Sequence, residues 1–219
     1  TPVAPEVAEA VASALHDTFG NASSLHAPGQ RARRALDEAR QAVAALVGAD
    51  PAGIVFTSGG TESDNLAVRG ALEAAPATRR RLVVGAVEHE AVLNTALALQ
   101  RRGWPVTIVP VTSDGVVTPE ALAPHLGPDV ALVSVMLANN ETGVVQPVAA
   151  LASLAHAAGA RFHTDAVQAI GKIEVDVREL DVDLLSLTGH KFGGPKGAGA
   201  LWIRRGVPMA GVLTGGRQE

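Results

Sequence analysis

The chain has 219 residues, a formal net charge of −4 and a hydrophobic share of 47%. This length predicts one large domain or slightly more. The small negative charge argues against a nucleic-acid-binding protein, because the longest basic cluster is Arg79–Arg81. The longest apolar run, residues 130–138, is too short to span a membrane, and the N-terminus lacks a signal-peptide pattern. We therefore expect a cytoplasmic protein with neither a nucleic-acid nor a membrane partner.

Two residue counts restrict the chemistry further. The chain has no Cys and no Tyr, so it offers no disulfide, no thiolate metal ligand, no cysteine nucleophile and no phenol. A primary amine side chain is present only at Lys172, Lys191 and Lys196. Any Schiff-base chemistry therefore has these lysines as its candidates.

Hydrophobic periodicity predicts helices and short strands that alternate along nearly the whole chain. Helices are expected near residues 7–15 and at Ala32–Val47, Glu62–Glu73, Ala91–Arg102, Pro119–Leu126 and Pro147–Ala158, with a loop at residues 26–29. Strands are expected at Ile54–Phe56, Leu82–Val87, Val106–Val111, Val130–Val135, Arg161–His163, Leu184–Leu187 and Ala200–Ile203.

These elements predict an α/β fold with a mainly parallel seven-stranded sheet and helices on both faces, because the strands are apolar on both faces and helices join them. The last connection differs. About a dozen Gly-rich residues without a helical pattern separate Leu187 from Ala200, so the last strand is expected to run antiparallel. Ligands of such sheets bind beyond the carboxyl ends of the strands, so the residues that follow each strand are the candidates for a site.

A glycine-rich turn follows the first strand. Gly59 and Gly60 allow a tight turn, and Thr61 is expected to cap the next helix with Asp64 as its capping-box partner. The free N–H groups of such a helix start can bind a phosphate, or the segment is a plain connection that binds nothing. The chain has no Walker A spacing and no G-x-G-x-x-G, so nucleotide binding lacks its main support.

Polar side chains also follow the other strands. Taken one at a time, a histidine in this position predicts a structural residue, an aspartate a helix cap and a lysine a solvated amine. Together, a phosphate-binding turn, a stacking imidazole, a carboxylate that keeps a ring nitrogen protonated and a reactive amine are what pyridoxal phosphate requires. These side chains are His89, Asn139, Asn140, Asp165, Gln168, Thr188, His190 and Lys191.

The sequence closely resembles the cysteine desulfurases of the class V aminotransferase group, of the type that supplies sulfur for iron–sulfur clusters. The resemblance extends over essentially the whole chain and implies a pyridoxal-phosphate-dependent enzyme with the large-domain fold called fold type I. The matching segments are residues 19–26, Ile54–Asn65, Val87–His89, Asn139–Gly143, His163–Gln168 and Gly189–Gly197.

The resemblance implies that Lys191 carries pyridoxal 5′-phosphate as a Schiff base and moves protons during the reaction. His89 stacks on the cofactor ring, and these two are the implied catalytic residues. Asp165 binds the ring nitrogen, and Gln168 bonds the ring hydroxyl. No metal ligand is implied.

The remaining implied contacts hold the cofactor phosphate and the substrate. Gly60, Thr61, Thr188 and His190 bind the phosphate, although the family commonly has Ser where this chain has Thr188. The hydroxyl is retained, so phosphate binding is expected to be retained as well. Asn140 lies by the ring hydroxyl and the substrate carboxylate.

The family reaction converts L-cysteine to L-alanine and leaves a persulfide on an enzyme cysteine, which passes sulfur to an iron–sulfur scaffold or a sulfur-carrier protein. Because this chain has no Cys, that residue is expected outside it. We expect residues 1–219 to be an incomplete cofactor-binding large domain without the small C-terminal domain. The full-length protein is expected to be a homodimer, and the chain alone to be inactive.

Three alternatives stay open. His163, Asp165 and His190 have the composition of an iron site of two histidines and one carboxylate, although this interpretation leaves the Gly-Gly-Thr turn and Lys191 without a role. A selenocysteine lyase or another class V enzyme would share the cofactor-binding residues. A non-catalytic fragment would bind the cofactor without forming alanine.

Overall fold

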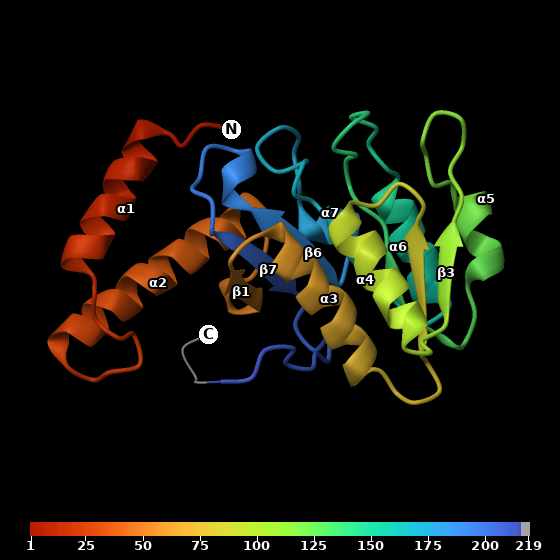
Figure 1. Cartoon of the computed structure of the whole chain (residues 1–219), viewed down its shortest axis with the longest axis horizontal. Coiled ribbons are helices and arrows are strands. Elements are labelled where there is room, and N and C mark those ends of the chain that lie inside the picture. Colours follow the sequence, from red (N-terminus) through yellow and green to blue (C-terminus); the bar gives the residue numbers. More distant parts are fainter. Residues whose placement is uncertain (216–219) are drawn as a thin grey trace.

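The computed structural model describes residues 1–215, and residues 216–219 of the expected domain lie outside the described part. The helices are α1 (Pro5–Asp17), α2 (Ala27–Leu46), α3 (Gly60–Ala74), α4 (Glu90–Arg101), α5 (Pro119–Leu122), α6 (Val148–Ala157) and α7 (Val177–Leu180). The strands are β1 (Ile54–Thr57), β2 (Arg81–Gly85), β3 (Val106–Val109), β4 (Val130–Ser134), β5 (Arg161–Asp165), β6 (Leu184–Thr188) and β7 (Gly199–Ile203). Figure 1 shows the helices packed around one twisted sheet.

The sheet has seven strands in the order β1-β7-β6-β5-β4-β2-β3. Strand β7 pairs antiparallel with both β1 and β6, and all other neighbours pair parallel. This confirms a mainly parallel sheet whose last strand is antiparallel. The short Gly-rich connection before β7 returns the chain along β6, as expected for a link without a crossover helix.

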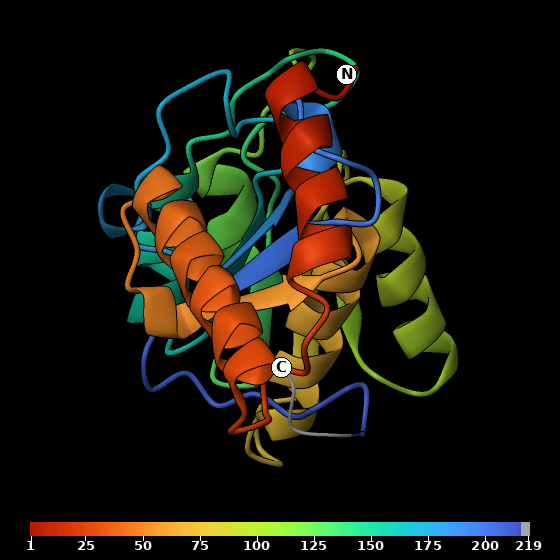
Figure 2. The same cartoon turned by 90° about the vertical axis from the view of Figure 1, so that its left-hand side faces the viewer.

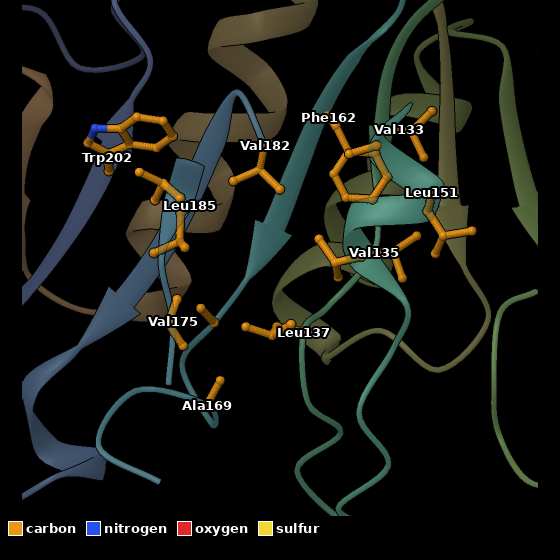
Figure 3. Close-up of a cluster of buried hydrophobic side chains, with 14 of the residues drawn as sticks. Val133, Val135, Leu137, Leu151, Phe162, Ala169, Val175, Val182, Leu185 and Trp202 are labelled. Carbon is orange, nitrogen blue, oxygen red and sulfur yellow. The ribbon is translucent and has the colours of Figure 1, made fainter. Parts of the chain in front are cut away.

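Two buried apolar clusters cover the two faces of the sheet, because neighbouring residues of a strand point to opposite faces. Helices α3 and α4 pack with Leu82 and Leu132 on one face. Helices α2 and α6 pack on the other face, where Phe162 and Leu185 are buried (Figure 3). Helices on both faces explain why the central strands are apolar throughout.

Several boundaries differ from the expected ones. Helix α2 starts at Ala27, five residues before Ala32 and within the expected loop, because His26 accepts a hydrogen bond from Gly29 N and Pro28 fits the first helical turn. Strand β2 ends at Gly85 and β3 at Val109, each two residues early, and β5 extends to Asp165. The short helix α7 was not predicted.

Helices α1 and α2 form what we call the N-terminal arm. Figures 1 and 2 show both helices at the end of the sheet that carries β1 and β7. Helix α1 has no buried residue within the described chain, and its start is tied to the loop after β6 by a hydrogen bond of 2.9 Å from Ala4 N to Gly193 O. No helix in residues 1–215 combines the length and the apolar character needed to cross a lipid bilayer.

Candidate active site

One pocket of about 190 Å³ lies at the carboxyl ends of the parallel strands. All nine residues that the sequence singled out for cofactor binding line this pocket, although they come from segments spread over 132 residues of the chain, from Gly60 to Lys191. The lining residues are Gly60, Thr61, Asp64, His89, Met136, Asn140, Asp165, Val167, Gln168, Thr188, His190 and Lys191.

One wall of the pocket is the start of α3. Gly59 precedes the helix with φ 156° and ψ 179°, a conformation that favours glycine, and it has no side chain to cap the helix. A Cβ at Gly199 of β7 would lie 2.6 Å from Gly59 Cα, so position 199 must be glycine for the turn to sit this close to the sheet, whereas Gly59 is required by its positive φ. The first N–H groups of α3 therefore face the pocket without a cap, which suits an anion.

The expected capping box at this helix start is wrong. Thr61 lies inside the first turn of α3, and Asp64 is buried instead of reaching back to the turn. Glu62 reaches back to the turn instead, since its Oε2 accepts a hydrogen bond of 2.8 Å from Ser58 N. The Thr61 side chain therefore does not cap the helix, and it lies exposed at the rim of the pocket.

The turn after β6 forms the adjacent wall, since a Cβ on Gly59 would lie 3.8 Å from the Thr188 hydroxyl oxygen. Thr188 is the buried last residue of that strand, and its hydroxyl donates to Ala198 O at 3.1 Å and lies 3.1 Å from His190 Nδ1. Lys191 ends the single 3-10 turn that follows, and its carbonyl accepts a hydrogen bond of 3.0 Å from the Thr1 hydroxyl. Partial desolvation, together with the nearby Lys191 and Lys196, lowers the pKa of the His190 imidazole.

His89 and Asn140 complete the sides. His89 caps α4 by accepting a hydrogen bond of 3.1 Å from Ala91 N at its Nδ1, so its ring orientation is fixed by the backbone. The two asparagines after β4 have different surroundings. Asn139 donates to Val87 O at 3.0 Å and accepts from the N–H of Thr142, which holds the turn, while the exposed Asn140 lines the pocket.

Asp165 is the acidic group of the pocket and is 4% exposed. Its Oδ1 accepts a hydrogen bond of 2.8 Å from Val167 N. Burial raises the pKa of the Asp165 carboxyl, whereas the Val167 hydrogen bond, His89 and Lys191 act in the opposite direction. A further cation in the pocket would favour the ionised form of Asp165.

Gln168 is held by a neighbour one helical turn away. Lys172 Nζ donates to Gln168 Oε1, so the amide presents its N–H groups as the remaining donors. This contact also engages Lys172 outside the pocket, and Lys196 is exposed. Of the chain's lysines, Lys191 alone lines the pocket.

The iron-site alternative is wrong. His163 is fully buried between Ser134 and Ser186 and does not line the pocket that Asp165 and His190 share. Within residues 1–215, no group of at least three His, Cys, Asp or Glu side chains is placed to hold a metal ion.

Four residues at or below the pocket were missed by sequence reasoning: Asp64, Glu88, Met136 and Val167. A usable signal exists for Asp64. It precedes Ala67, Val68 and Ala71 by the spacing of one buried helix face. That pattern places its carboxyl on the sheet side of α3, not at the cap.

This donor set defines a ligand. An uncapped helix start beside Thr188 and His190 suits a phosphate, the Asp165 carboxylate suits a protonated ring nitrogen, and the Gln168 amide suits a ring oxygen. A Cβ on Gly60 would lie 2.8 Å from Val167 Cγ2, so the helix start packs too closely for a larger residue. The residues present fit an anionic aromatic cofactor with an amine-reactive group near Lys191.

Comparison with known proteins agrees with this geometry. The family model of class-V aminotransferases matches residues 1–218. The chain is 53% identical to a cysteine desulfurase of Cereibacter sphaeroides over 221 residues, which is 100% of this chain and 57% of that protein. It therefore spans somewhat more than half the length of this curated relative.

Solved structures of similar proteins share the fold. A NifS-like protein superposes with a TM-score of 0.95 at 39% identity, over 99% of this chain and 60% of that one. A structure described as SspA in complex with cysteine superposes with a TM-score of 0.93 at 36% identity, over 99% of this chain and 63% of that one. The expected fold type I of pyridoxal-phosphate-dependent proteins is thus confirmed.

Proposed function

The chain belongs to the class-V aminotransferase family of pyridoxal-phosphate-dependent enzymes, and we propose that it forms the cofactor-binding part of a cysteine desulfurase. The proposed reaction converts L-cysteine to L-alanine and transfers the sulfur to an enzyme cysteine as a persulfide. That cysteine lies outside this chain, which contains none. One observation carries the proposal: Lys191 and Asp165, distant in sequence, face the same pocket and interact electrostatically.

The phosphate of pyridoxal 5′-phosphate is assigned to the start of α3 and the turn after β6. The uncapped N–H groups near Gly60 and the Thr61 hydroxyl bind it from one side, and Thr188 and His190 bind it from the other. A helix start favours a dianion because its N–H groups carry partial positive charge. This contact anchors the cofactor without using Lys191.

The ring of the cofactor is assigned to the space between His89 and the end of β5. Asp165 keeps the ring nitrogen protonated, Gln168 donates to the ring oxygen, and the His89 imidazole covers the ring face. When bound, the cofactor supplies an electron sink for the substrate carbanion. Lys191 forms the covalent link and moves protons at the substrate Cα, and Asn140 orients the substrate carboxylate.

The decisive experiment incubates the chain with pyridoxal 5′-phosphate, reduces the adduct with borohydride and locates the labelled peptide by mass spectrometry. The label is expected at Lys191, and Lys191→Ala is expected to abolish both the label and the visible band of the lysine-bound cofactor. Lys196→Ala, an exposed lysine in the same loop, is the matched control and should label as the wild type does. Retention of the band in Lys191→Ala would refute the assignment.

The domain organisation is part of the proposal. Residues 1–219 are assigned to the large domain, with a small C-terminal domain elsewhere in a longer protein, because the chain spans 57% of its relative. The chain alone is then expected to bind cofactor but to form no alanine from L-cysteine, whereas the longer protein forms it. Alanine formation by the chain alone would contradict this division. Selenocysteine as a parallel substrate tests the lyase alternative.

The partners are proposed on the same basis. A homodimer is supported by apolar side chains of the N-terminal arm and the adjacent loop that find no cover within the described chain: Leu15 is 74% exposed, Phe19 75% and Leu25 91%. The sulfur acceptor is proposed to be an iron–sulfur scaffold or a sulfur-carrier protein in the cytoplasm. Pull-down with a persulfide-loaded longer protein and cell fractionation test these assignments.

A further inference from the structure

Three buried carboxyl groups lie at or beneath the bottom of the pocket, and we call Asp64, Glu88 and Asp165 the carboxyl floor. Their exposed fractions are 1%, 5% and 4%. They are close enough for each to influence the others electrostatically. Three carboxylates at such close range are not all ionised, because burial raises the pKa of each carboxyl and the charge of Asp165 raises the pKa values of Asp64 and Glu88 further. The proposed function uses only Asp165, so the other two need an account.

Asp64 is supported from behind by a buried chain of hydrogen bonds. Ser134 Oγ lies 2.8 Å from His163 Nδ1, and Ser186 Oγ lies 2.9 Å from His163 Nε2. Ser186 in turn hydrogen-bonds the Asp64 carboxyl. All four side chains are at most 1% exposed, so this chain joins β4, β5 and β6 to α3 through the interior.

The histidine in this chain provides no positive charge. His163 Nε2 lies 3.7 Å from Asp64 Oδ1, which would form an ion pair only if the ring were protonated. Complete burial lowers the pKa of His163 to about 3, so the imidazole is neutral at physiological pH. Asp64 Oδ1 then has no hydrogen-bond partner within the described chain, which is costly for a carboxylate and far less so for a carboxylic acid.

Asp165 has the opposite surroundings. It receives the Val167 N–H at 2.8 Å, and both His89 and Lys191 favour its ionised form. Around Asp64, by contrast, burial and the neighbouring Asp165 both favour the protonated form, and Ser186 alone favours the anion. Of this pair, Asp165 is therefore the residue that ionises.

Glu88 extends the same pattern. Its Oε1 accepts a hydrogen bond of 2.6 Å from Met136 N, whereas its Oε2 is buried without a partner in the described part of the chain. Burial, Asp165 and Asp64 raise the pKa of the Glu88 carboxyl well above its usual range. Glu88 is thus a neutral brace between the loop before α4 and the segment after β4.

We propose that Asp64 is a positioning residue of the cofactor site: it remains an uncharged carboxylic acid, and this leaves Asp165 as the single ionised carboxylate of the carboxyl floor. The inference rests on the proposed function for the identity of the cofactor. It adds a residue that acts through Asp165 without forming the ring-nitrogen contact itself. The charge presented to the ring is then one negative charge instead of three.

The first test uses the pH titration of the visible band of the lysine-bound cofactor. The Asp64→Asn side chain has the shape of the uncharged aspartic acid and carries no charge. Its titration midpoint is therefore expected to match that of the wild type, and its cofactor Kd to stay within about threefold. Asp64→Ala removes the partner of Ser186 and admits water beside Asp165, so Kd is expected to rise about tenfold. Rescue of the alanine defect by asparagine distinguishes an uncharged Asp64 from an ionised one.

Asp165→Asn serves as the comparator because it removes the proposed anion, and its titration midpoint is expected to shift. Exposed Asp114→Asn is the matched control with no expected effect. If Asp64→Asn shifts the midpoint as Asp165→Asn does, then Asp64 carries charge and the inference is overturned.

The second test needs no cofactor. Because the folded-state pKa of Asp64 is raised, the folded chain binds more protons than the unfolded chain above about pH 4, so stability falls as pH rises. Asp64→Asn should remove part of this decline, and the infrared carbonyl band of a protonated carboxyl should weaken in the variant. Parallel stability profiles with an unchanged band would refute the neutral acid. Failure of the wild type to bind cofactor would instead count against the proposed function alone.

Discussion

The carboxyl floor and the N-terminal arm differ in which side chains they bury and which they expose. The floor buries polar groups, with Asp64 1% and Asp165 4% exposed, and His163 behind it is fully buried. The arm exposes apolar groups, since α1 has no buried residue within the described chain and Leu15 is 74% exposed. Each departs from the ordinary distribution of polar and apolar residues, in which charges are solvated and large apolar side chains are covered.

The two regions also differ in the contacts that stabilise them. The floor is held by backbone donors such as Val167 N and Met136 N and by the strands beneath it, so its geometry is complete within one chain. Within the arm, α2 packs Ala44 into the core, but α1 buries no residue within the described chain, so further stabilisation of α1 is expected from another molecule or from the longer protein. Substitutions in the two regions should therefore affect different measurements.

The largest difference is expected from a Phe→Ala substitution made once on the strand that carries Asp165 of the floor and once in the loop that joins the two helices of the arm. Phe162→Ala removes a fully buried ring from the strand that carries Asp165, and it should lower the free energy of unfolding by about 3–5 kcal/mol. Phe19→Ala removes a ring that is 75% exposed and should change it by less than about 0.5 kcal/mol. Urea denaturation at equal protein concentration measures both, and equal losses would mean that the arm is packed in solution.

The next effect concerns the floor alone. Asp165→Asn keeps the hydrogen bond from Val167 N but removes the negative charge, so the cofactor Kd is expected to rise about 100-fold. The overall stability without cofactor should hardly fall, since burial opposes the ionised form. Fluorescence titration measures the affinity. An unchanged Kd would place the pyridinium partner elsewhere.

A smaller effect is expected from His163 as the pH falls. Burial lowers the pKa of His163 to about 3 in the folded chain from its ordinary value of 6.5, so the unfolded chain binds the extra proton between these values and stability is lost on acidification. The loss amounts to about 2 kcal/mol between roughly pH 6.5 and 4.5. His163→Asn, which does not titrate there, should be less stable at neutral pH but show a shallower acid decline in urea denaturation. An identical slope would show that the ring is not buried as a neutral group.

The smallest effect on stability should come from Leu15→Ser on the arm. The substitution is expected to leave the unfolding of the chain within about 0.5 kcal/mol of wild type and to weaken self-association of the longer protein. Analytical ultracentrifugation across a concentration series measures the association. The control is Asp114→Ser, at an exposed position in a distant loop, which should leave self-association unchanged.

Much of this fold could be predicted because its strands are short apolar runs separated by helices. The antiparallel direction of β7 followed from the length of one connection. The nine residues proposed to bind the cofactor were selected from their positions after strands together with the family resemblance, and they line one pocket. Strand order did not follow, because pairing of β1 with β7 depends on contacts that no local pattern records.

The errors have local physical causes. The start of α2 was missed because Pro28 and Gly29 indicate a loop, whereas His26 converts them into a first helical turn. Asp64 was assigned to a cap because its spacing from Thr61 fits one, but the apolar face of α3 takes it inward. The capping-box spacing concerns two residues three positions apart, whereas burial of the apolar face of α3 involves the whole helix and decides the orientation of Asp64.

The position of β7 has a consequence for how the protein acquires its site. Ile54 of β1 pairs with Trp202, 148 residues later, and among the strands of residues 1–215 β7 is the single neighbour of β1. During synthesis on the ribosome, β1 must therefore wait until β7 has emerged before it finds its partner, and such distant pairing is slow. The turn at Gly59 and Gly60 follows β1 directly, so this turn, which we propose binds the phosphate, is expected to be the last part of the pocket to form.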